Sequence, residues 1–357
     1  MADDNSDTIE ALIVALPESA GSAIYGLVDV FASTGTLWRE FVGDEAGRRR
    51  IRPKIVSLSR DPFLCGNGIP VQPELTIHEK SDAGIVVVSE LWLAPDDDLR
   101  QRYPELKEWL RQRHRAGNTI YSACSGAVLL AASGLLNGKS ATCHWGYADL
   151  FRRSFPEVHF IPEPNIVFAD ESGRIVTAGG ATSWHDLAIH IISRHCSPGE
   201  ALHIAKLYLL QWHGDGQLPF ASLVRRQLHA DSIVRKAEDW LRKHFREPHA
   251  VSAVVAECDI PERSLKRRFS VATGSTVIGY VQNLRIEEAK RLLESGDTSS
   301  DAIASAVGYE NPAFFRKLFK RSTGLTAGQY RRMFRPISDA SHAHAGPALQ
   351  SNTVLST

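Results

Sequence analysis

The sequence predicts two domains: an α/β domain whose mostly parallel sheet is covered by helices on both faces, and a smaller all-helical domain after it. Three observations lead to this prediction. A chain of 357 residues is too long for one ordinary domain. Strand and helix patterns alternate over the first 200 residues, which is typical of α/β folds. From about Ala230 onward every pattern is helical.

Short, nearly continuous apolar runs mark the strands of the first domain, as expected of strands covered on both faces. The runs are Ile9–Pro17, Ile51–Ser59, Ala83–Glu90, Asn118–Ala123 and the shorter Arg174–Gly180. Helical patterns occupy Ala23–Ser33, Asp98–Arg115, Ser125–Ala132, Gly146–Phe155, Ser183–His195 and Gly199–Trp212. This alternation predicts a flavodoxin-like parallel sheet.

Composition predicts the domain boundaries. We expect the α/β domain over residues 8–210 and a linker over residues 211–230, because His213–Arg226 contains Gly, Asp and Pro. The helical domain is then residues 231–336. Residues 337–357 are small, polar and nearly uncharged, so they cannot bury enough surface to order themselves, and we expect a disordered tail.

Charge and cysteine usage narrow the class of protein. Residues 1–230 carry a net charge of −5 and residues 231–336 a net charge of +6. A compact basic domain indicates an anionic partner, most simply nucleic acid. The five scattered cysteines form no CxxC pair, so we expect neither a disulfide framework nor a zinc site. We also expect no other metal and no cofactor. No apolar run is long enough to cross a membrane and the N-terminus is acidic, which favours a cytoplasmic protein.

The basic domain contains an internal repeat. Leu265–Tyr280 and Phe315–Tyr330 match at an offset of about 50 residues, with Phe, Thr, Gly and Tyr at corresponding positions. In each copy a short helix of small residues, a tight turn and a second helix follow one another, which is the order of a helix-turn-helix motif. The i, i+4 pairs Leu265/Phe269 and Phe315/Phe319 are predicted to face the core.

Residues 232–335 resemble the DNA-binding domain of AraC/XylS-type transcription regulators. The resemblance rests on "RIEEAKRLLE" and "AIASAVGYENPAFFRKLFKRSTGLTAGQYRRMF". It implies a dimer and DNA contacts from Arg263, Lys266, Arg267, Phe314, Arg316 and Lys317. One departure is Asp259, which stands where the family usually has glycine, as Gly308 does in the second copy. Aspartate tolerates the left-handed conformation, so we expect the turn to form with some strain.

A second candidate site lies at "TIYSACSGAVLLAASG", where a predicted strand meets a predicted helix. The sharp turn holds Cys124, Ser125 and Gly126. A side chain at this place lies at the carboxyl end of the sheet, where open α/β folds bind ligands. The positive end of the following helix points at the sulfur and favours the thiolate, so the position suits a nucleophile.

Residues 8–195 resemble the PfpI-like branch of the class I glutamine amidotransferase-like superfamily, through "ACSGAVLLAASGLLNGKSATCHW" and "GLVDVFASTG". With an AraC-type domain after it, the chain resembles the GlxA-type regulators. The resemblance implies that His144 is the base beside Cys124. Enzymatic members also have an acidic residue in the loop after the first strand. The corresponding position in this chain is Ala23, and the acidic residue of the same loop, Glu18, lies five residues before it. No catalytic residue is therefore assigned.

Together these patterns predict a DNA-binding transcription regulator, an activator, whose first domain senses a small nitrogen-containing metabolite. The expected ligand-binding residues are Cys124, Ser125, Gly126, His144 and Trp145. The aromatic ring of Trp145 suits a cationic or flat nitrogenous ligand. The expected partners are double-stranded promoter DNA, the effector, a second copy of the chain and RNA polymerase. Two alternatives stay open: a thiol-dependent amidase- or hydratase-like enzyme fused to a DNA-binding domain, and a redox sensor acting through Cys124.

Overall fold

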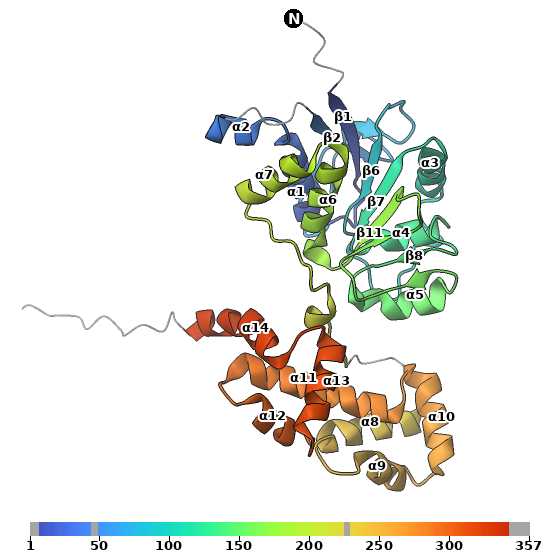
Figure 1. The fold of residues 1–357 in the computed structure, drawn as a ribbon. Coiled ribbons are helices and arrows are strands. Elements are labelled where there is room, and N and C mark those ends of the chain that lie inside the picture. The colour runs from blue at the N-terminus through green and yellow to red at the C-terminus, as the bar shows by residue number, and fades with distance from the viewer. Residues whose placement is uncertain (1–6, 44–48, 225–228, 343–357) are drawn as a thin grey trace, which may run out of the picture. The chain divides into compact units, whose positions relative to one another are not determined.

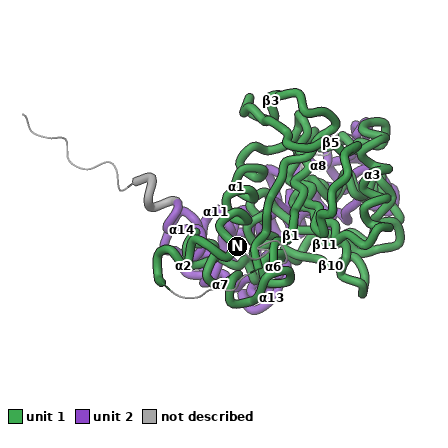
Figure 2. Tube along the Cα trace, turned by 90° about the horizontal axis from the view of Figure 1, so that it is seen from above, with its two compact units in different colours: residues 1–218 green, residues 219–357 purple. Residues whose placement is uncertain are grey.

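The chain divides into two compact units in a computed structural model that describes residues 7–43, 49–224 and 229–342. The N-terminal unit comprises residues 1–218 and the C-terminal unit residues 219–357 (Figure 2). The boundary lies inside the linker expected at residues 211–230.

In the described part of the N-terminal unit, seven strands form one sheet (Figure 1). Their order is β10 (Ile166–Phe168), β11 (Ile175–Ala178), β7 (Thr119–Ala123), β6 (Ile85–Val88), β1 (Thr8–Val14), β2 (Arg50–Ser57) and β5 (Leu75–Thr76). All neighbours run parallel except β10, which is antiparallel to β11. Short pairs form beside the sheet, antiparallel between β3 (Phe63–Leu64) and β4 (Pro70–Val71) and parallel between β8 (Ser140–Ala141) and β9 (His159–Phe160).

Helices cover both faces of this sheet, which confirms the predicted α/β class (Figure 1). Alternate strand residues point to opposite faces, as the pleat requires. Ile13, Val87 and Tyr121 pack with α1 (Gly21–Ala32), α6 (Trp184–His195) and α7 (Pro198–Leu207). Leu12, Val86 and Ile120 pack with α3 (Pro104–Arg115), α4 (Gly126–Ala132) and α5 (Ala148–Ser154). The remaining helix of this unit's described part, α2, spans Leu37–Val42.

Several expected helix ends were wrong for a local backbone reason. The helix expected from Asp98 begins at Pro104, because Leu99 and Tyr103 adopt positive φ values of 57° and 54°. The helix expected to reach Trp212 ends at Leu207, two residues before Leu209 with φ 54°. The helix expected at 146–155 divides into a 3-10 turn, 145–147, and α5. The short elements β3, β4, β5, β8, β9, β10 and α2 were not predicted.

The described part of the C-terminal unit is entirely helical, as predicted (Figure 1). A 3-10 turn at Leu218–Phe220 leads into it. The helices are α8 (Ser232–His244), α9 (Ala250–Cys258), α10 (Glu262–Thr273), α11 (Val277–Ser295), α12 (Ser300–Ala306), α13 (Pro312–Thr323) and α14 (Ala327–His342). Residues 337–342, expected in the disordered tail, therefore belong to α14, and residues 343–357 lie outside the described residues.

Helix α11 joins two apolar cores in this unit. Its first half, with Tyr280 and Leu284, packs with α8, α9 and α10, while its second half, with Ile286 and Leu293, packs with α12, α13 and α14. One helix thereby holds both repeats. Within the described residues, no helix of either unit is long and apolar enough to cross a membrane.

Candidate functional site

The second helix of each repeat buries the side predicted to face the core. Leu265 and Phe269 on α10, and Phe315 and Phe319 on α13, are fully buried. The remaining side of each helix is exposed, including Arg263, Lys266, Arg267, Phe314, Arg316 and Lys317. Phe314 keeps 48% of its surface exposed at the start of α13. Exposing an apolar ring to water is unfavourable, and a bound partner would cover it, so this face is suited to binding.

The turns between the paired helices form differently in the two repeats. Asp259 adopts the left-handed conformation with φ 49°, as expected from the sequence. Gly308 has φ +92°, and a Cβ atom there would collide with the carbonyl oxygen of Arg246. The first turn therefore accepts a side chain that the second cannot. After the turns, Asn311 caps α13 by accepting hydrogen bonds from the amides of Ala313 and Phe314.

The exposed cations of α10 and α13 differ in whether an acidic side chain pairs with them. Lys266 forms an ion pair with Glu262 one turn earlier, and Arg316 forms one with Asp301 of α12. Among the described residues, no acidic side chain pairs with Arg267 or Lys317. These two side chains can therefore meet a phosphate without first breaking an ion pair.

Arg285 of α11 ties the first repeat to the second. Its guanidinium donates hydrogen bonds to the carbonyl oxygens of Phe245 at 2.7 Å, Gly308 at 2.8 Å and Glu247 at 3.0 Å. It also lies over the ring of Tyr309, 5.0 Å from the ring centre. Because Gly308 belongs to the second helix-turn-helix turn and Phe245 and Glu247 lie between α8 and α9, one side chain bonds the segment before the first motif to the turn of the second.

In the N-terminal unit, Cys124 forms the strained elbow that the sequence predicts. It follows β7 directly, has φ 51°, and donates its backbone N–H to the carbonyl oxygen of Ala178 at 2.9 Å. A positive φ in a residue other than glycine marks a position that the surrounding structure enforces. The side chain is only 3% exposed.

A carboxyl group that the sequence analysis missed lies beside this cysteine. The thiol of Cys124 donates to Glu90 Oε1 at 3.7 Å. Val88 of β6 is paired with Ser122 of β7, so Glu90 and Cys124 both stand two residues beyond that pair. The parallel register of these two strands was the signal that could have found Glu90. Glu18, in contrast, binds Arg102 and the hydroxyl of Tyr103.

The expectation of a thiolate at Cys124 was wrong. Burial, and then the charge of Glu90, raise the pKa of the thiol far above its usual range. Burial also raises the pKa of Glu90, whereas the hydrogen bond from the thiol lowers it. A short helix cannot offset the loss of water around the sulfur, so the thiol stays protonated at neutral pH.

Ser125 and Gly126 are used by the fold itself. The hydroxyl of Ser125 accepts the backbone N–H of Leu91 at 2.8 Å and donates to the carbonyl oxygen of the same residue. At Gly126 a Cβ atom would collide with the carbonyl oxygen of Val88 and come within 2.7 Å of that of Ser89. Both residues are buried, and their contacts allow the start of α4 to pack closely against the end of β6.

His144 and Trp145 form a more open part of the same sheet edge. Nδ1 of His144 accepts the backbone N–H of Gly146 at 2.9 Å, so the ring presents its other nitrogen away from the turn. The rings of His144 and Trp145 lie 4.8 Å apart between centres. Both side chains are half-buried, in contrast to Cys124. The backbone N–H of Trp145 donates to Gln217 Oε1 at 3.3 Å, a contact from the expected linker that the sequence did not suggest.

Family models match both units. The helix-turn-helix domain model matches residues 254–333, and the DJ-1/PfpI family model matches residues 33–194. The HTH-type transcriptional regulator CdhR of Pseudomonas aeruginosa is 26% identical over 300 residues, which are 82% of this chain and 85% of CdhR. The chain is an AraC-family helix-turn-helix regulator with an N-terminal DJ-1/PfpI domain.

Further relatives of this regulator agree with that assignment. The HTH-type transcriptional regulator GlxA of Rhizobium meliloti is 28% identical over 228 residues, covering 62% of this chain and 68% of GlxA. The isonitrile hydratase of Pseudomonas putida is 37% identical over 82 residues, but these are 23% of this chain and 33% of the hydratase. These two longer matches are thus to transcription regulators, and this match to an enzyme is partial.

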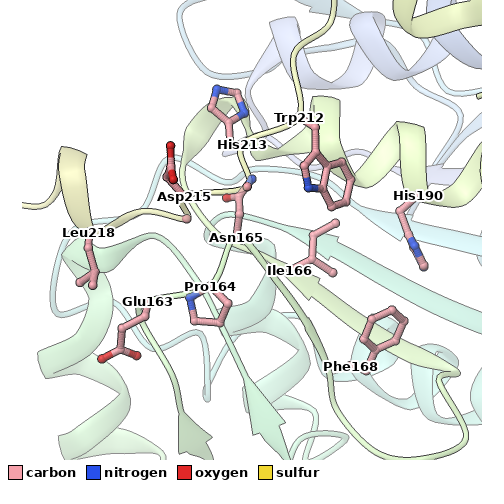
Figure 3. Close-up of a pocket in the computed structure, with 12 residues that line it drawn as sticks. Glu163, Pro164, Asn165, Ile166, Phe168, His190, Trp212, His213, Asp215 and Leu218 are labelled. Carbon is pink, nitrogen blue, oxygen red and sulfur yellow. The ribbon is translucent and has the colours of Figure 1, made fainter. Parts of the chain in front are cut away.

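The regulator also has a cavity of about 580 Å³ between β10 and the chain around Trp212 (Figure 3). That volume is within the range of small-molecule sites. Phe168 and Trp212, which line it, are 50% and 56% exposed, and Nε2 of His190 is buried there with no hydrogen-bond partner among the described residues. Burial lowers the pKa of His190, so its ring is neutral.

Proposed function

We propose that this regulator binds promoter DNA as a dimer through α10 and α13, and that its N-terminal unit senses a small nitrogen-containing metabolite and so activates transcription. The observation that supports the DNA-binding mode most directly is the exposed face of the two recognition helices. Each carries cations at the positions implied by the AraC resemblance, and each has its aromatic anchor buried.

Two helix-turn-helix motifs joined by α11 and Arg285 suit two major-groove segments on one face of the duplex, about one helical turn apart. Arg263, Lys266 and Arg267 would contact one segment, and Phe314, Arg316 and Lys317 the other. The exposed ring of Phe314 suits an apolar base edge such as the thymine methyl group. A homodimer would supply two such units to one operator.

The effector would bind at the carboxyl edge of the sheet. His144 and Trp145 offer partly exposed rings, and the buried residues Cys124, Ser125 and Gly126 form the elbow at the same edge. Aromatic rings at this edge favour a cationic or flat nitrogenous molecule. A buried, protonated thiol argues against both alternatives from the sequence, since an enzyme and a redox sensor each need an accessible thiolate.

Alanine substitutions at Arg267 and Lys317 test the DNA-binding face. Each change should weaken binding to an operator fragment by about 1–3 kcal/mol, or roughly 5- to 150-fold, with little loss of stability, because neither side chain has an acidic partner among the described residues. The measurement is fluorescence anisotropy on a fragment selected from promoter DNA, with Lys243→Ala on α8 as the matched control. Wild-type affinity in both variants would show that α10 and α13 are not the DNA-binding face.

A Cys124→Ala variant tests the sensor. We expect a reporter promoter to respond to candidate nitrogenous metabolites as strongly with this variant as with the wild type, and we expect purified wild-type protein to leave those metabolites unchanged. Loss of the response on mild thiol oxidation of the wild type, but not of the variant, would instead establish the redox sensor. Metabolite turnover abolished by the substitution would establish the enzyme.

A further inference from the structure

The side-chain carboxamide of Gln217 is hydrogen-bonded through both its nitrogen and its oxygen. Nε2 donates to Thr142 Oγ1 at 3.0 Å and to the carbonyl oxygens of Cys143 at 3.0 Å and Pro162 at 3.1 Å. Oε1 accepts the backbone N–H of Trp145 at 3.3 Å. Gln217 is only 3% exposed. Acceptors surround the nitrogen and a donor faces the oxygen, which fixes the orientation of the amide group.

The surroundings of this amide are shaped to admit it. At Gly179 a Cβ atom would occupy the position of the Gln217 carboxamide. The hydroxyl of Thr142 donates its proton to the carbonyl oxygen of Pro164 at 3.2 Å, so its lone pairs remain for the amide nitrogen. The site adjoins the elbow, because Gly179 follows the Ala178 carbonyl that binds the Cys124 backbone.

Gln217 belongs to a segment, residues 212–218, that we call the strap. The strap runs beside Pro164 and Asn165 (Figure 3). The backbone N–H and the ring of His213 both bind the buried Asp186 carboxyl, each at 2.8 Å. The backbone N–H of Gln217 donates to the carbonyl oxygen of Glu163 at 3.0 Å. The start of the expected linker is therefore bonded to the N-terminal unit by polar contacts.

The chain just after the strap is bonded to the C-terminal unit. Lys290 Nζ donates to the carbonyl oxygen of Ala221 at 2.7 Å, and the backbone N–H of Leu223 donates to Glu287 Oε1 at 2.8 Å. Few residues separate this anchored segment from the strap. A short length of chain thus joins the strap to the residues that Lys290 and Glu287 of α11 bind.

We propose that Thr142, Cys143, Trp145 and Pro162 form a carboxamide-binding site, occupied here by the chain's own Gln217, and that an effector bearing a primary carboxamide takes this place and releases the strap. The inference rests on the proposed function and names the effector's chemical class. A carboxylate would set negative oxygens against three acceptors, and an ammonium group has no oxygen to accept a hydrogen bond from the Trp145 N–H. A primary amide satisfies both.

Chemical rescue of a Gln217→Ala variant tests the site in the full-length protein, with acetamide as the probe. The variant should melt at a lower temperature than the wild type, and its strap amides should exchange hydrogen about tenfold faster or more, as expected for the loss of at least one net hydrogen bond. Acetamide should raise the melting temperature and slow the exchange in this variant. Sodium acetate at the same concentration should not. Gln211→Ala, at an exposed position just before the strap, is the matched control and should behave as the wild type.

Wild-type protein provides a second measurement that does not depend on the variant's folding. Acetamide should compete with Gln217 and speed exchange in the strap while leaving exchange in β1 and β7 unchanged. Equal effects of acetamide and acetate on Gln217→Ala, or strap exchange in the wild type that is insensitive to acetamide, would overturn the carboxamide site. Operator binding measured on the same samples separates the outcomes, because intact DNA binding would leave the proposed regulator function standing.

Discussion

Replacing Arg285 by methionine tests how the two helix-turn-helix motifs are held together. Methionine keeps an unbranched apolar stem but removes every donor of the guanidinium. Three carbonyl oxygens, those of Phe245, Glu247 and Gly308, lose their charged partner at once. Because these oxygens come from segments on both sides of α11, the change should affect both repeats.

The size of the effect follows from those contacts. A hydrogen bond from a charged donor contributes about 1.5–3 kcal/mol, and a carbonyl left unpaired in the interior costs a similar amount. Removing the guanidinium from water costs free energy and offsets part of the stabilisation from these hydrogen bonds. The same burial is the main cause of the lowered pKa of Arg285. We expect the free energy of unfolding of the C-terminal unit to fall by about 3 kcal/mol.

Urea unfolding followed by circular dichroism, in parallel with operator binding, measures both consequences. Arg291→Met is the matched control, since Arg291 lies on the same helix but forms an exposed ion pair with Glu288. That pair should contribute about 1 kcal/mol or less. We also expect weaker operator binding for Arg285→Met, because the bonds that join the α8–α9 segment to the turn before α13 are lost. A loss of stability below about 1 kcal/mol, or equal losses in the two variants, would refute the reasoning.

Three further predictions concern single residues. Cys124 should resist iodoacetamide at pH 8 in the folded protein, since burial raises its thiol pKa, and peptide mass spectrometry that finds rapid native modification would contradict this. Burial lowers the pKa of His195 from 6.5 to about 4, so its contribution to stability is complete above pH 6.5 and is lost as the pH falls towards 4. The urea midpoint of His195→Gln should consequently fall less between pH 7 and pH 5 than that of the wild type. Gly308→Ala should lower the melting temperature more than Gly43→Ala, since both glycines have positive φ but only Gly308 meets a backbone carbonyl.

Local patterns predicted much of the C-terminal unit. Leu265 and Phe269 recur at helical spacing, and so do Phe315 and Phe319, and each pair faces the core. Gly274 and Gly324, the glycines that correspond in the repeat, end α10 and α13 in the left-handed conformation. Such signals are readable because the residues that decide them lie within a few positions of each other.

The N-terminal unit was harder to predict because contacts distant in sequence decide its site. The elbow at Cys124 is visible in the sequence, but its partner Glu90 stands 34 positions away and meets it through strand register. Gln217 stands 72 positions from Trp145, in a segment whose composition predicts only a linker. Neither contact leaves a periodic pattern in the chain.

The sequence by itself determined the main alternation of strands and helices, the repeated helix-turn-helix motif and the place of the cysteine elbow, because these depend on side-chain periodicity and turn chemistry. Only the tertiary structure decided the protonation of Cys124, the structural use of Ser125 and Gly126, and the bonding of the strap. These depend on burial and on which distant groups share a site, and water is excluded from the sulfur and from the Gln217 amide only once the sheet and its loops have assembled.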